Sequence, residues 1–257
     1  MRLKSLSTLI FLALLWSHLA YGGQCIAHRA LSEGVELENT VAAVTAAQKS
    51  GVSRIELDLR FTKDGVAVIH HDAEVNGVFI GETDYIELVE RELRVDKLQT
   101  LFELATPIKL VLLDIKDNDI EIDDLRAALP ATYFCQTIAF QSESLGLLRK
   151  IGSAWPSCER YWVAKLKRRY WFGSFPSAAS LVSRLKAQDL DGIVAKGRRF
   201  VDKEYVGQFQ NSGLKYLVWT INKTARIKRY EEIGVDAIIT DAPLACMDVT
   251  GEDYSKK

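Results

Sequence analysis

The sequence predicts an α/β protein built as a single (β/α)8 barrel, and three observations support this fold. Short apolar segments alternate with helical segments along the chain, which indicates a parallel sheet with right-handed crossovers. Eight strand–helix units fit between residues 24 and 257, and a barrel of this kind takes about 250 residues. No linker rich in proline or serine interrupts this region. An open doubly wound sheet is the alternative, but no glycine-rich phosphate loop follows the first strand.

The expected elements follow from the apolar pattern. Strands are predicted at 24–28, 55–61, 110–116, 137–140, 161–166, 192–194, 216–220 and 237–240. Helices are predicted at 39–50, 99–105, 120–129, 142–151, 178–187, 202–212 and 224–233. The first helix has Val41, Val44 and Gln48 at helical spacing and ends at Gly51.

A small hairpin extension is predicted after the second strand. Lys63-Asp64-Gly65 separates that strand from another apolar run at 66–70. An Asp-Gly pair between two apolar runs is a strong signal for a β-hairpin.

Composition and charge limit the class of protein. The chain of 257 residues is 48% hydrophobic and 26% charged, which fits a globular protein and excludes a disordered or multi-span membrane chain. Its formal net charge of -1 gives no electrostatic reason to expect nucleic acid or an anionic membrane as a partner.

The first 23 residues read as a signal peptide. Arg2 and Lys4 give a basic start, 9–16 is an unbroken apolar run, and Ala20-Tyr21-Gly22 places small residues before a cleavage point. The run is too short to span a bilayer, which takes about 20 residues. We therefore expect residues 24–257 to form the mature domain, exported to the periplasm or secreted, without a stable membrane anchor. A buried N-terminal helix is the alternative.

The four cysteines are too widely spaced for a zinc motif. An oxidising compartment permits disulfides. Cys135 and Cys158 each lie just before an expected strand, and these two strands should be neighbours, so we predict a Cys135–Cys158 disulfide at the bottom of the barrel. Free, buried cysteines are the alternative.

Polar side chains gather where the first three expected barrel strands end, which is where barrel enzymes place their chemistry. Glu56 and Asp58 share one face of the second strand, and alternation directs them into the barrel mouth. The third strand ends in Asp114-Ile115-Lys116. The first ends in His28-Arg29, and His71 closes the hairpin.

Taken singly, each of these residues has an ordinary structural explanation, such as a solvated strand edge, a surface ion pair or a hydrogen-bonded histidine. Together they would be costly to bury unless they pair or hold a metal ion. Three carboxylates without a cysteine suit a hard cation such as Mg²⁺ or Ca²⁺. We therefore predict that Glu56, Asp58 and Asp114 bind one divalent cation.

These motifs resemble those of the glycerophosphodiester phosphodiesterase family, whose members are barrels related to phospholipase C. The resemblance runs in order over essentially all of the mature chain. The matching segments are His28-Arg29, Glu38-Asn39-Thr40, Glu56-Leu57-Asp58, 62–66 with His71-Asp72, Asp114-Ile115-Lys116, 218–222 and 234–243.

Three positions depart from the family pattern. Ala30 replaces the usual glycine, Leu37 the usual proline, and Asp114 the usual glutamate. Aspartate at this last position also occurs in sphingomyelinase D-type phospholipases. The stretch between His71 and Leu98 is short, so the inserted subdomain of some family members is expected to be reduced.

The resemblance implies metal-dependent hydrolysis of small glycerophosphodiesters, such as glycerophosphocholine, to sn-glycerol 3-phosphate and an alcohol. It implies His28 and His71 as general acid and base, since an imidazole exchanges protons near neutral pH. Arg29 and Lys116 would neutralise the phosphate. We expect Trp219 to cover the pocket, and a tryptophan packed in the core is the alternative.

Two other functions remain open. Phospholipase D-type cleavage of lysophospholipid or sphingolipid head groups would need an apolar route for an acyl chain, for which the later loops offer Trp171, Phe172, Phe175 and Phe200. A non-catalytic barrel that binds phosphate esters could keep the charges, but it would have little need for two histidines.

Overall fold

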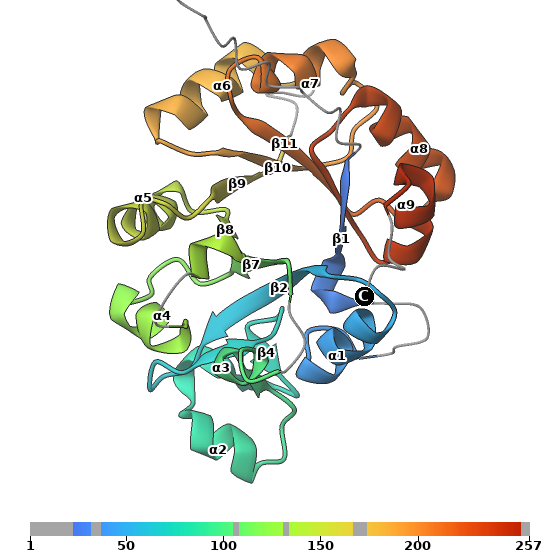
Figure 1. Cartoon of the computed structure of the whole chain (residues 1–257). Coiled ribbons are helices and arrows are strands. Elements are labelled where there is room, and N and C mark those ends of the chain that lie inside the picture. The colour runs from blue at the N-terminus through green and yellow to red at the C-terminus, as the bar shows by residue number, and fades with distance from the viewer. Residues whose placement is uncertain (1–22, 32–36, 105–107, 131–133, 167–173, 253–257) are drawn as a thin grey trace, which may run out of the picture.

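The computed structural model describes residues 23–31, 37–104, 108–130, 134–166 and 174–252, and it confirms the predicted barrel (Figure 1). Eight parallel strands form a closed ring, because β1 pairs with both β12 and β2. In order around the ring these strands are β1 (Gln24–Ala27), β2 (Arg54–Phe61), β7 (Leu110–Ile115), β8 (Ile138–Ser142), β9 (Arg160–Ala164), β10 (Gly192–Lys196), β11 (Lys215–Trp219) and β12 (Ala237–Thr240).

Helices surround the ring on the outside (Figure 1). They are α1 (Val41–Lys49), α3 (Leu98–Leu101), α4 (Ile122–Ala128), α5 (Leu145–Ala154), α6 (Ala178–Ala187), α7 (Lys203–Gln210), α8 (Thr224–Ile233) and α9 (Pro243–Thr250). The side chains of Thr40, Ser144, Ser177 and Asp202 cap helices α1, α5, α6 and α7 by accepting hydrogen bonds from backbone N–H groups. Helix α9 was not predicted from the sequence.

The extension after β2 contains the predicted hairpin, three further short strands and one short α-helix. Strand β3 (Ala67–Ile69) pairs antiparallel with β2, and Gly65 in the turn has a φ of 78°, in the left-handed region that favours glycine. Beyond β3, the chain forms a second hairpin of β4 (Glu74–Val75) and β5 (Val78–Phe79), then helix α2 (Tyr85–Glu90). Strand β6 (Asp96–Lys97) pairs back onto β3. These last four elements were not predicted.

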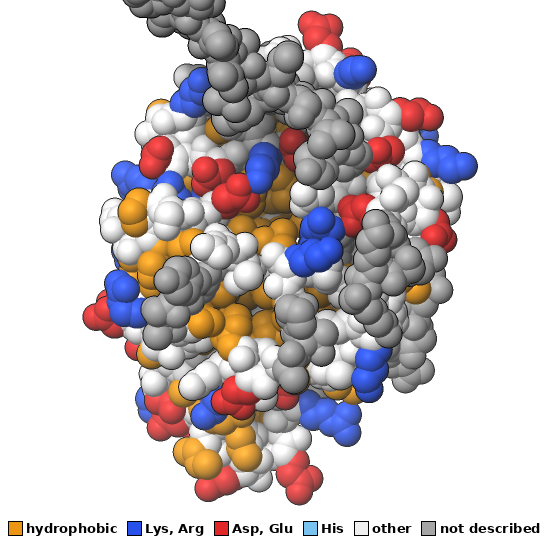
Figure 2. Space-filling view, in the orientation of Figure 1, with side chains coloured by type: hydrophobic (Ala, Val, Ile, Leu, Met, Phe, Trp, Pro, Cys, Tyr) orange, Lys and Arg blue, Asp and Glu red, His pale blue; other side chains and the backbone are white. Residues whose placement is uncertain are grey.

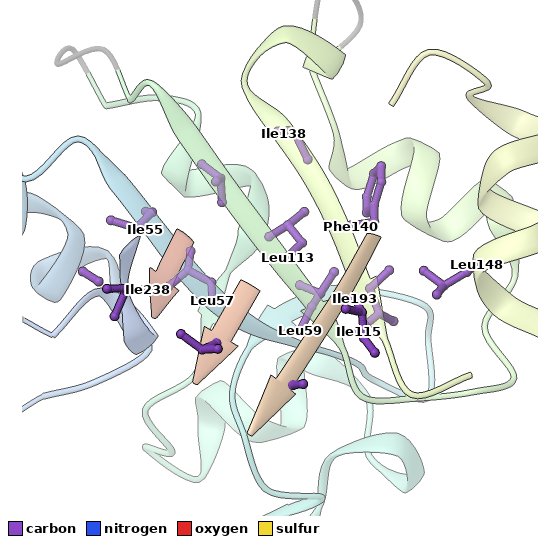
Figure 3. Packing of buried hydrophobic residues seen from close by; sticks show 14 of the residues in the cluster. Ile55, Leu57, Leu59, Leu113, Ile115, Ile138, Phe140, Leu148, Ile193 and Ile238 are labelled. Atoms are coloured by element: carbon purple, nitrogen blue, oxygen red, sulfur yellow. The ribbon is translucent and has the colours of Figure 1, made fainter. Parts of the chain in front are cut away.

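Alternation along the strands divides the apolar side chains between two layers. Ile55, Leu57 and Leu59 are fully buried between the barrel and its helices, and Figure 3 shows them within this packed cluster. Ile26, Leu112 and Leu217 belong to a second cluster inside the ring. Burial of each such side chain stabilises the fold by about 1.5–3 kcal/mol. The period-2 pattern therefore leaves the inward face of β2 for Glu56 and Asp58.

The surface agrees with the near-neutral net charge. Figure 2 shows acidic and basic side chains interspersed on one face of the molecule, around a hollow with hydrophobic side chains at its centre. Among the described residues, no helix is both long and apolar enough to cross a membrane. The expected signal peptide falls almost wholly outside the described residues.

Two disulfides join the described cysteines. The predicted Cys135–Cys158 bond is present, with its Cα atoms 4.5 Å apart. A second bond, between Cys25 in β1 and Cys246 in α9, was not predicted and links positions 221 residues apart. It ties the first strand of the barrel to the last helix.

Candidate active site

Three buried carboxylates meet where β2 and β7 end. The two strands pair in parallel with Asp58 opposite Asp114, and Glu56 lies two residues earlier on the same face of β2. Oxygen atoms of the three groups lie within 4.8 Å of one another. The side chains of Asp58 and Asp114 are 1% and 11% exposed, and Glu56 as a whole residue is 2% exposed. The convergence predicted from the sequence is therefore present.

Two cations and an amide compensate part of this charge. Lys116 Nζ lies 2.7 Å from Asp58 Oδ1 and 2.6 Å from Asp114 Oδ2. Arg29 Nε lies 3.2 Å from Asp58 Oδ2, and Asn39 Nδ2 donates to the same oxygen at 2.7 Å. Although burial opposes it, Lys116 and Asn39 hold the pKa of Asp58 below its usual value. Asp58 is thus kept ionised.

Of the three carboxylates, Glu56 has the fewest positively charged groups within ion-pair distance to offset its negative charge. Burial, followed by the charges of Asp58 and Asp114, raises its pKa well above the usual value. Its Oε2 accepts a hydrogen bond from the backbone N–H of Arg29 at 2.9 Å, and Gln141 Nε2 lies 3.4 Å from Oε1. Gln141 Oε1 is buried and has no hydrogen-bond partner among the described residues. An oxygen-only donor set with uncompensated negative charge fits a hard divalent cation.

A strained turn connects His28 to the carboxylates. His28–Ala30 forms a short 3₁₀ turn after β1, in which Arg29 and Ala30 have φ values of 53° and 55°. For a residue with a Cβ atom, this left-handed conformation costs about 1–2 kcal/mol. The turn aims the Arg29 N–H at Glu56, so the backbone itself helps to hold the acidic cluster.

His28 is held by a carboxylate from the far end of the chain. Its Nδ1 lies 2.7 Å from Asp241 Oδ1, and Asn222 Nδ2 donates to Asp241 Oδ2 at 2.5 Å. The hydrogen bond from His28 lowers the pKa of Asp241. Since an ionised carboxylate only accepts hydrogen bonds, Nδ1 carries the proton and Nε2 is the nitrogen available for proton transfer.

His71 forms a similar but more exposed pair. Its Nδ1 lies 2.7 Å from Asp72 Oδ1, and the two side chains are 40% and 73% exposed. The hydrogen bond from His71 lowers the pKa of Asp72. The neighbouring His70 lies with Nε2 3.3 Å from the Glu74 carbonyl oxygen.

One cavity brings all the predicted site residues together. It has a volume of about 490 Å³, and its lining includes His28, Arg29, Glu56, Asp58, His71, Asp114, Lys116 and Trp219. The indole Nε1 of Trp219 is buried without a hydrogen-bond partner among the described residues, so it can donate to a ligand there. The cavity combines two histidines, three carboxylates and two cations, which suits hydrolysis of a phosphate ester.

Four residues of this site were not predicted as site residues from the sequence. Asp241 pairs with His28 and accepts a hydrogen bond from Asn222, Asp72 pairs with His71, and Gln141 contacts Glu56. Asn222, Asp241 and Gln141 stand at or just beyond the ends of barrel strands, which is the signal that identified His28. For the proposed acyl route, Trp171 and Phe172 lie outside the described residues, whereas Phe175 and Phe200 stack at 4.1 Å.

Comparison with known protein families identifies one matching model. The model described as the glycerophosphoryl diester phosphodiesterase family matches residues 28–111 and 121–245. The chain is 27% identical over 239 residues to a glycerophosphodiester phosphodiesterase from Caldanaerobacter subterraneus subsp. tengcongensis, which covers 85% of this chain and 93% of that protein.

Solved structures show the same fold. A putative glycerophosphodiester phosphodiesterase from Galdieria sulphuraria superposes with a TM-score of 0.76 at 19% identity, over 90% of this chain and 98% of that one. A phosphodiesterase from Oleispira antarctica, solved in complex with the product sn-glycerol-3-phosphate, superposes with a TM-score of 0.71 at 21% identity, over 91% and 99% of the two chains.

Proposed function

This chain belongs to the glycerophosphoryl diester phosphodiesterase family, and on that premise we propose that it hydrolyses glycerophosphodiesters, such as glycerophosphocholine, to sn-glycerol 3-phosphate and an alcohol. The observation that supports this most is the pair of histidines on one cavity, each with Nδ1 bonded to a carboxylate and Nε2 left for proton transfer. Two such groups suit a reaction that needs one base and one acid.

Glu56, Asp58 and Asp114 would hold one divalent cation, Mg²⁺ or Ca²⁺. When bound, the cation would polarise the phosphoryl oxygens. Lys116, with a pKa raised by Asp114 and Asp58 against the effect of burial, stays protonated and contributes a fixed positive charge beside the phosphate. Arg29 contributes a second cation from the same cavity wall. Trp219 would donate its indole N–H to the substrate.

Hydrolysis would proceed in two steps, and in each step one histidine accepts a proton while the other donates one. A hydroxyl of the glycerol attacks phosphorus while Nε2 of one histidine takes its proton, and the other histidine protonates the departing alcohol oxygen. The P–O bond to the alcohol breaks as the cyclic phosphate forms. Water then opens the ring, with the two histidines exchanging roles, and sn-glycerol 3-phosphate is released. The product bound to the Oleispira antarctica protein supports this outcome.

Product analysis tests the proposal. The protein is incubated with glycerophosphocholine and Mg²⁺ or Ca²⁺, and phosphorus NMR follows the phosphate esters while proton NMR follows free choline. We expect sn-glycerol 3-phosphate and choline, with a transient cyclic glycerophosphate. Phosphocholine as the main product would place the broken bond on the other side of phosphorus and contradict the proposal. Turnover of lysophospholipid micelles without turnover of water-soluble diesters would favour the phospholipase D-type alternative. Tight binding without any turnover would favour the non-catalytic barrel.

We also propose that residues 1–23 are a signal peptide and that residues 24–257 form the exported enzyme, periplasmic or secreted. The two disulfides support an oxidising location. The N-terminal sequence of the protein recovered outside the cytoplasm is expected to begin at Gln24. Recovery of the intact chain from the cytoplasm, with reduced cysteines, would contradict this assignment.

A further inference from the structure

The two histidines of the candidate active site are attached to the barrel in different ways. His28 pairs with Asp241, which comes directly after β12, so a barrel strand holds its ring in place. His71 pairs with its neighbour in the chain, Asp72, and the two side chains are 40% and 73% exposed. A pair of adjacent residues has no fixed position relative to the barrel, because both partners move together. His71 therefore needs another connection to the barrel.

The backbone pairing between β2 and β3 stops just before His71. The register of the two strands ends with Leu59 opposite Ile69. The next hydrogen bond runs from the His70 N–H to the Asp58 carbonyl oxygen at 3.0 Å. Among the described residues, no further backbone hydrogen bond of this hairpin reaches His71. The hydrogen bond that holds the His71 backbone comes instead from a side chain.

Arg60 supplies this hydrogen bond. Its Nε donates to the His71 carbonyl oxygen at 3.0 Å, and its side chain is 17% exposed. Arg60 follows Asp58 by two positions in β2, so its side chain lies on the same face of the strand and lines the catalytic cavity. The carbonyl oxygen belongs to the planar peptide between His71 and Asp72. Fixing this plane fixes the backbone from which both side chains of the pair extend.

Asp117 holds the guanidinium of Arg60. Its Oδ1 lies 2.5 Å from Arg60 Nη1, and its Oδ2 accepts a hydrogen bond from the Phe61 N–H at 2.9 Å. Asp117 comes two residues after the end of β7, the strand that carries Asp114. A guanidinium is planar and has its donors in a rigid arrangement. Once Nη1 is bound by Asp117, Nε is therefore directed at the His71 carbonyl oxygen.

Direct binding of phosphate by Arg60 is the alternative role, since this residue lines the cavity. Two observations favour a positioning role. Nε and Nη1 of Arg60 already donate hydrogen bonds, and Asp117 balances the positive charge. Arg29 and Lys116 each lie within ion-pair distance of Asp58, so two other cations already stand beside the carboxylates.

We propose that Arg60 is a positioning residue for His71, and that it acts by joining the end of β7, through Asp117, to the chain that follows β3. The inference rests on the proposed function, in which His71 transfers a proton. A misplacement of about 1 Å in a reacting group can lower a rate by about 10²-fold. Because the substrate does not bind to Arg60 itself, its loss should change kcat and leave KM nearly unchanged.

Steady-state kinetics test this role. Arg60→Met removes both hydrogen bonds and keeps an unbranched side chain. We expect it to lower kcat on glycerophosphocholine by about 10²-fold, and to leave KM and the calorimetric Kd for Mg²⁺ within a few fold. Arg94→Met, at an exposed arginine of the same extension, is the matched control and keeps kcat. A higher KM with unchanged kcat would overturn the inference, because Arg60 would then bind the substrate directly. An unchanged kcat and KM in Arg60→Met would also overturn it.

Chemical rescue separates positioning from a general loss of structure. In Arg60→Ala, millimolar guanidinium chloride is expected to recover part of kcat, because free guanidinium offers the same planar set of donors to Asp117 and to the His71 carbonyl oxygen. Methylammonium has the same charge without this donor set, and it should not recover kcat. Equal recovery with the two cations would mean that Arg60 contributes only its charge, which is contrary to the inference.

A last measurement does not depend on turnover. Histidine precedes aspartate in this chain only at His71-Asp72, so labelling histidine carbonyls with ¹³C and aspartate nitrogens with ¹⁵N selects this one peptide by NMR. The order parameter of the Asp72 N–H is expected to fall from about 0.85 in the wild type to below about 0.6 in Arg60→Met, and to stay high in Arg94→Met. A value that stays high in Arg60→Met would refute the positioning role. If the wild type hydrolyses no diester, the proposed function is wrong, and this order parameter then decides whether Arg60 holds the His71 backbone.

Discussion

His28 Nδ1 lies 2.7 Å from Asp241 Oδ1 although 213 positions separate the two residues in the chain. Asn222 secures Asp241 from the other side, so the imidazole is held in one orientation. In His–carboxylate pairs of this kind, the carboxylate selects the tautomer and stabilises the protonated ring. The pair therefore explains how a histidine at the end of β1 is prepared for proton transfer.

Replacing this carboxylate tests its positioning role. We expect Asp241→Asn to lower kcat by about 10²–10⁴-fold, because the amide can stabilise the wrong tautomer of His28. Asp72→Asn, in the more exposed pair with His71, is expected to have a smaller effect. Steady-state kinetics of the two variants on glycerophosphocholine check both. Equal rate losses in the two variants would contradict this role.

The same pair makes stability depend on pH. The pKa of Asp241 is lowered in the folded protein by its hydrogen bond to His28. Its contribution is therefore present above the ordinary aspartate pKa of about 3.9 and is lost as the pH falls through the lower folded value. We expect Asp241→Asn to have a lower Tm than the wild type near neutral pH, by about 2–4 °C for each kcal/mol lost, and the difference to close in acid. Calorimetric scans between neutral pH and about pH 3 check this.

The two catalytic candidates differ from their neighbour His70. His28→Ala and His71→Ala are each expected to reduce kcat by about 10²–10⁴-fold, the usual loss when a general acid or base is removed. His70→Ala, whose ring contacts the Glu74 carbonyl, should retain activity within a few fold. Initial rates on glycerophosphocholine measure all three variants. A full rate in His71→Ala would remove that residue from the mechanism.

Metal binding is expected to depend on the carboxylate cluster. Asp114→Asn should weaken Mg²⁺ or Ca²⁺ binding by at least about tenfold without unfolding the barrel, because it removes one ligand charge from a buried set. Titration calorimetry measures the affinity, circular dichroism checks the fold, and exposed Asp119→Asn is the control. Exhaustive chelation should abolish turnover. Full activity without detectable metal would refute the cation site.

The two disulfides should differ in their effect on stability. Replacing both Cys25 and Cys246 with alanine opens a loop of 221 residues, and replacing Cys135 and Cys158 opens one of 23. In the chain-entropy model the first loss is about 5 kcal/mol and the second about 3 kcal/mol. Urea unfolding of the two double variants measures the difference. A larger loss in the Cys135/Cys158 variant would show that loop closure is not the dominant contribution.

Local sequence patterns determined the barrel strands and the acidic cluster. The alternation of Ile55, Glu56, Leu57 and Asp58 is sufficient to place the carboxylates in the barrel mouth, because successive strand side chains point to opposite faces. The Asp64-Gly65 turn likewise predicted the β2–β3 hairpin, since the glycine provides the left-handed backbone the turn requires. The short elements β4, β5, α2 and β6 have too few residues to show a periodic pattern.

Contacts between residues far apart in the chain follow from closure of the ring and could not be predicted from the sequence. Pairing of β1 with β12 brings Cys25 to Cys246 and His28 to Asp241, whose positions along the chain differ by more than 200 residues. No local pattern records such contacts, because they depend on the spatial order of the strands and not on the period within one strand. The alternation along each strand is therefore enough to predict which side chains face the barrel mouth. Which of these side chains contact one another depends on the order of the strands in the closed ring.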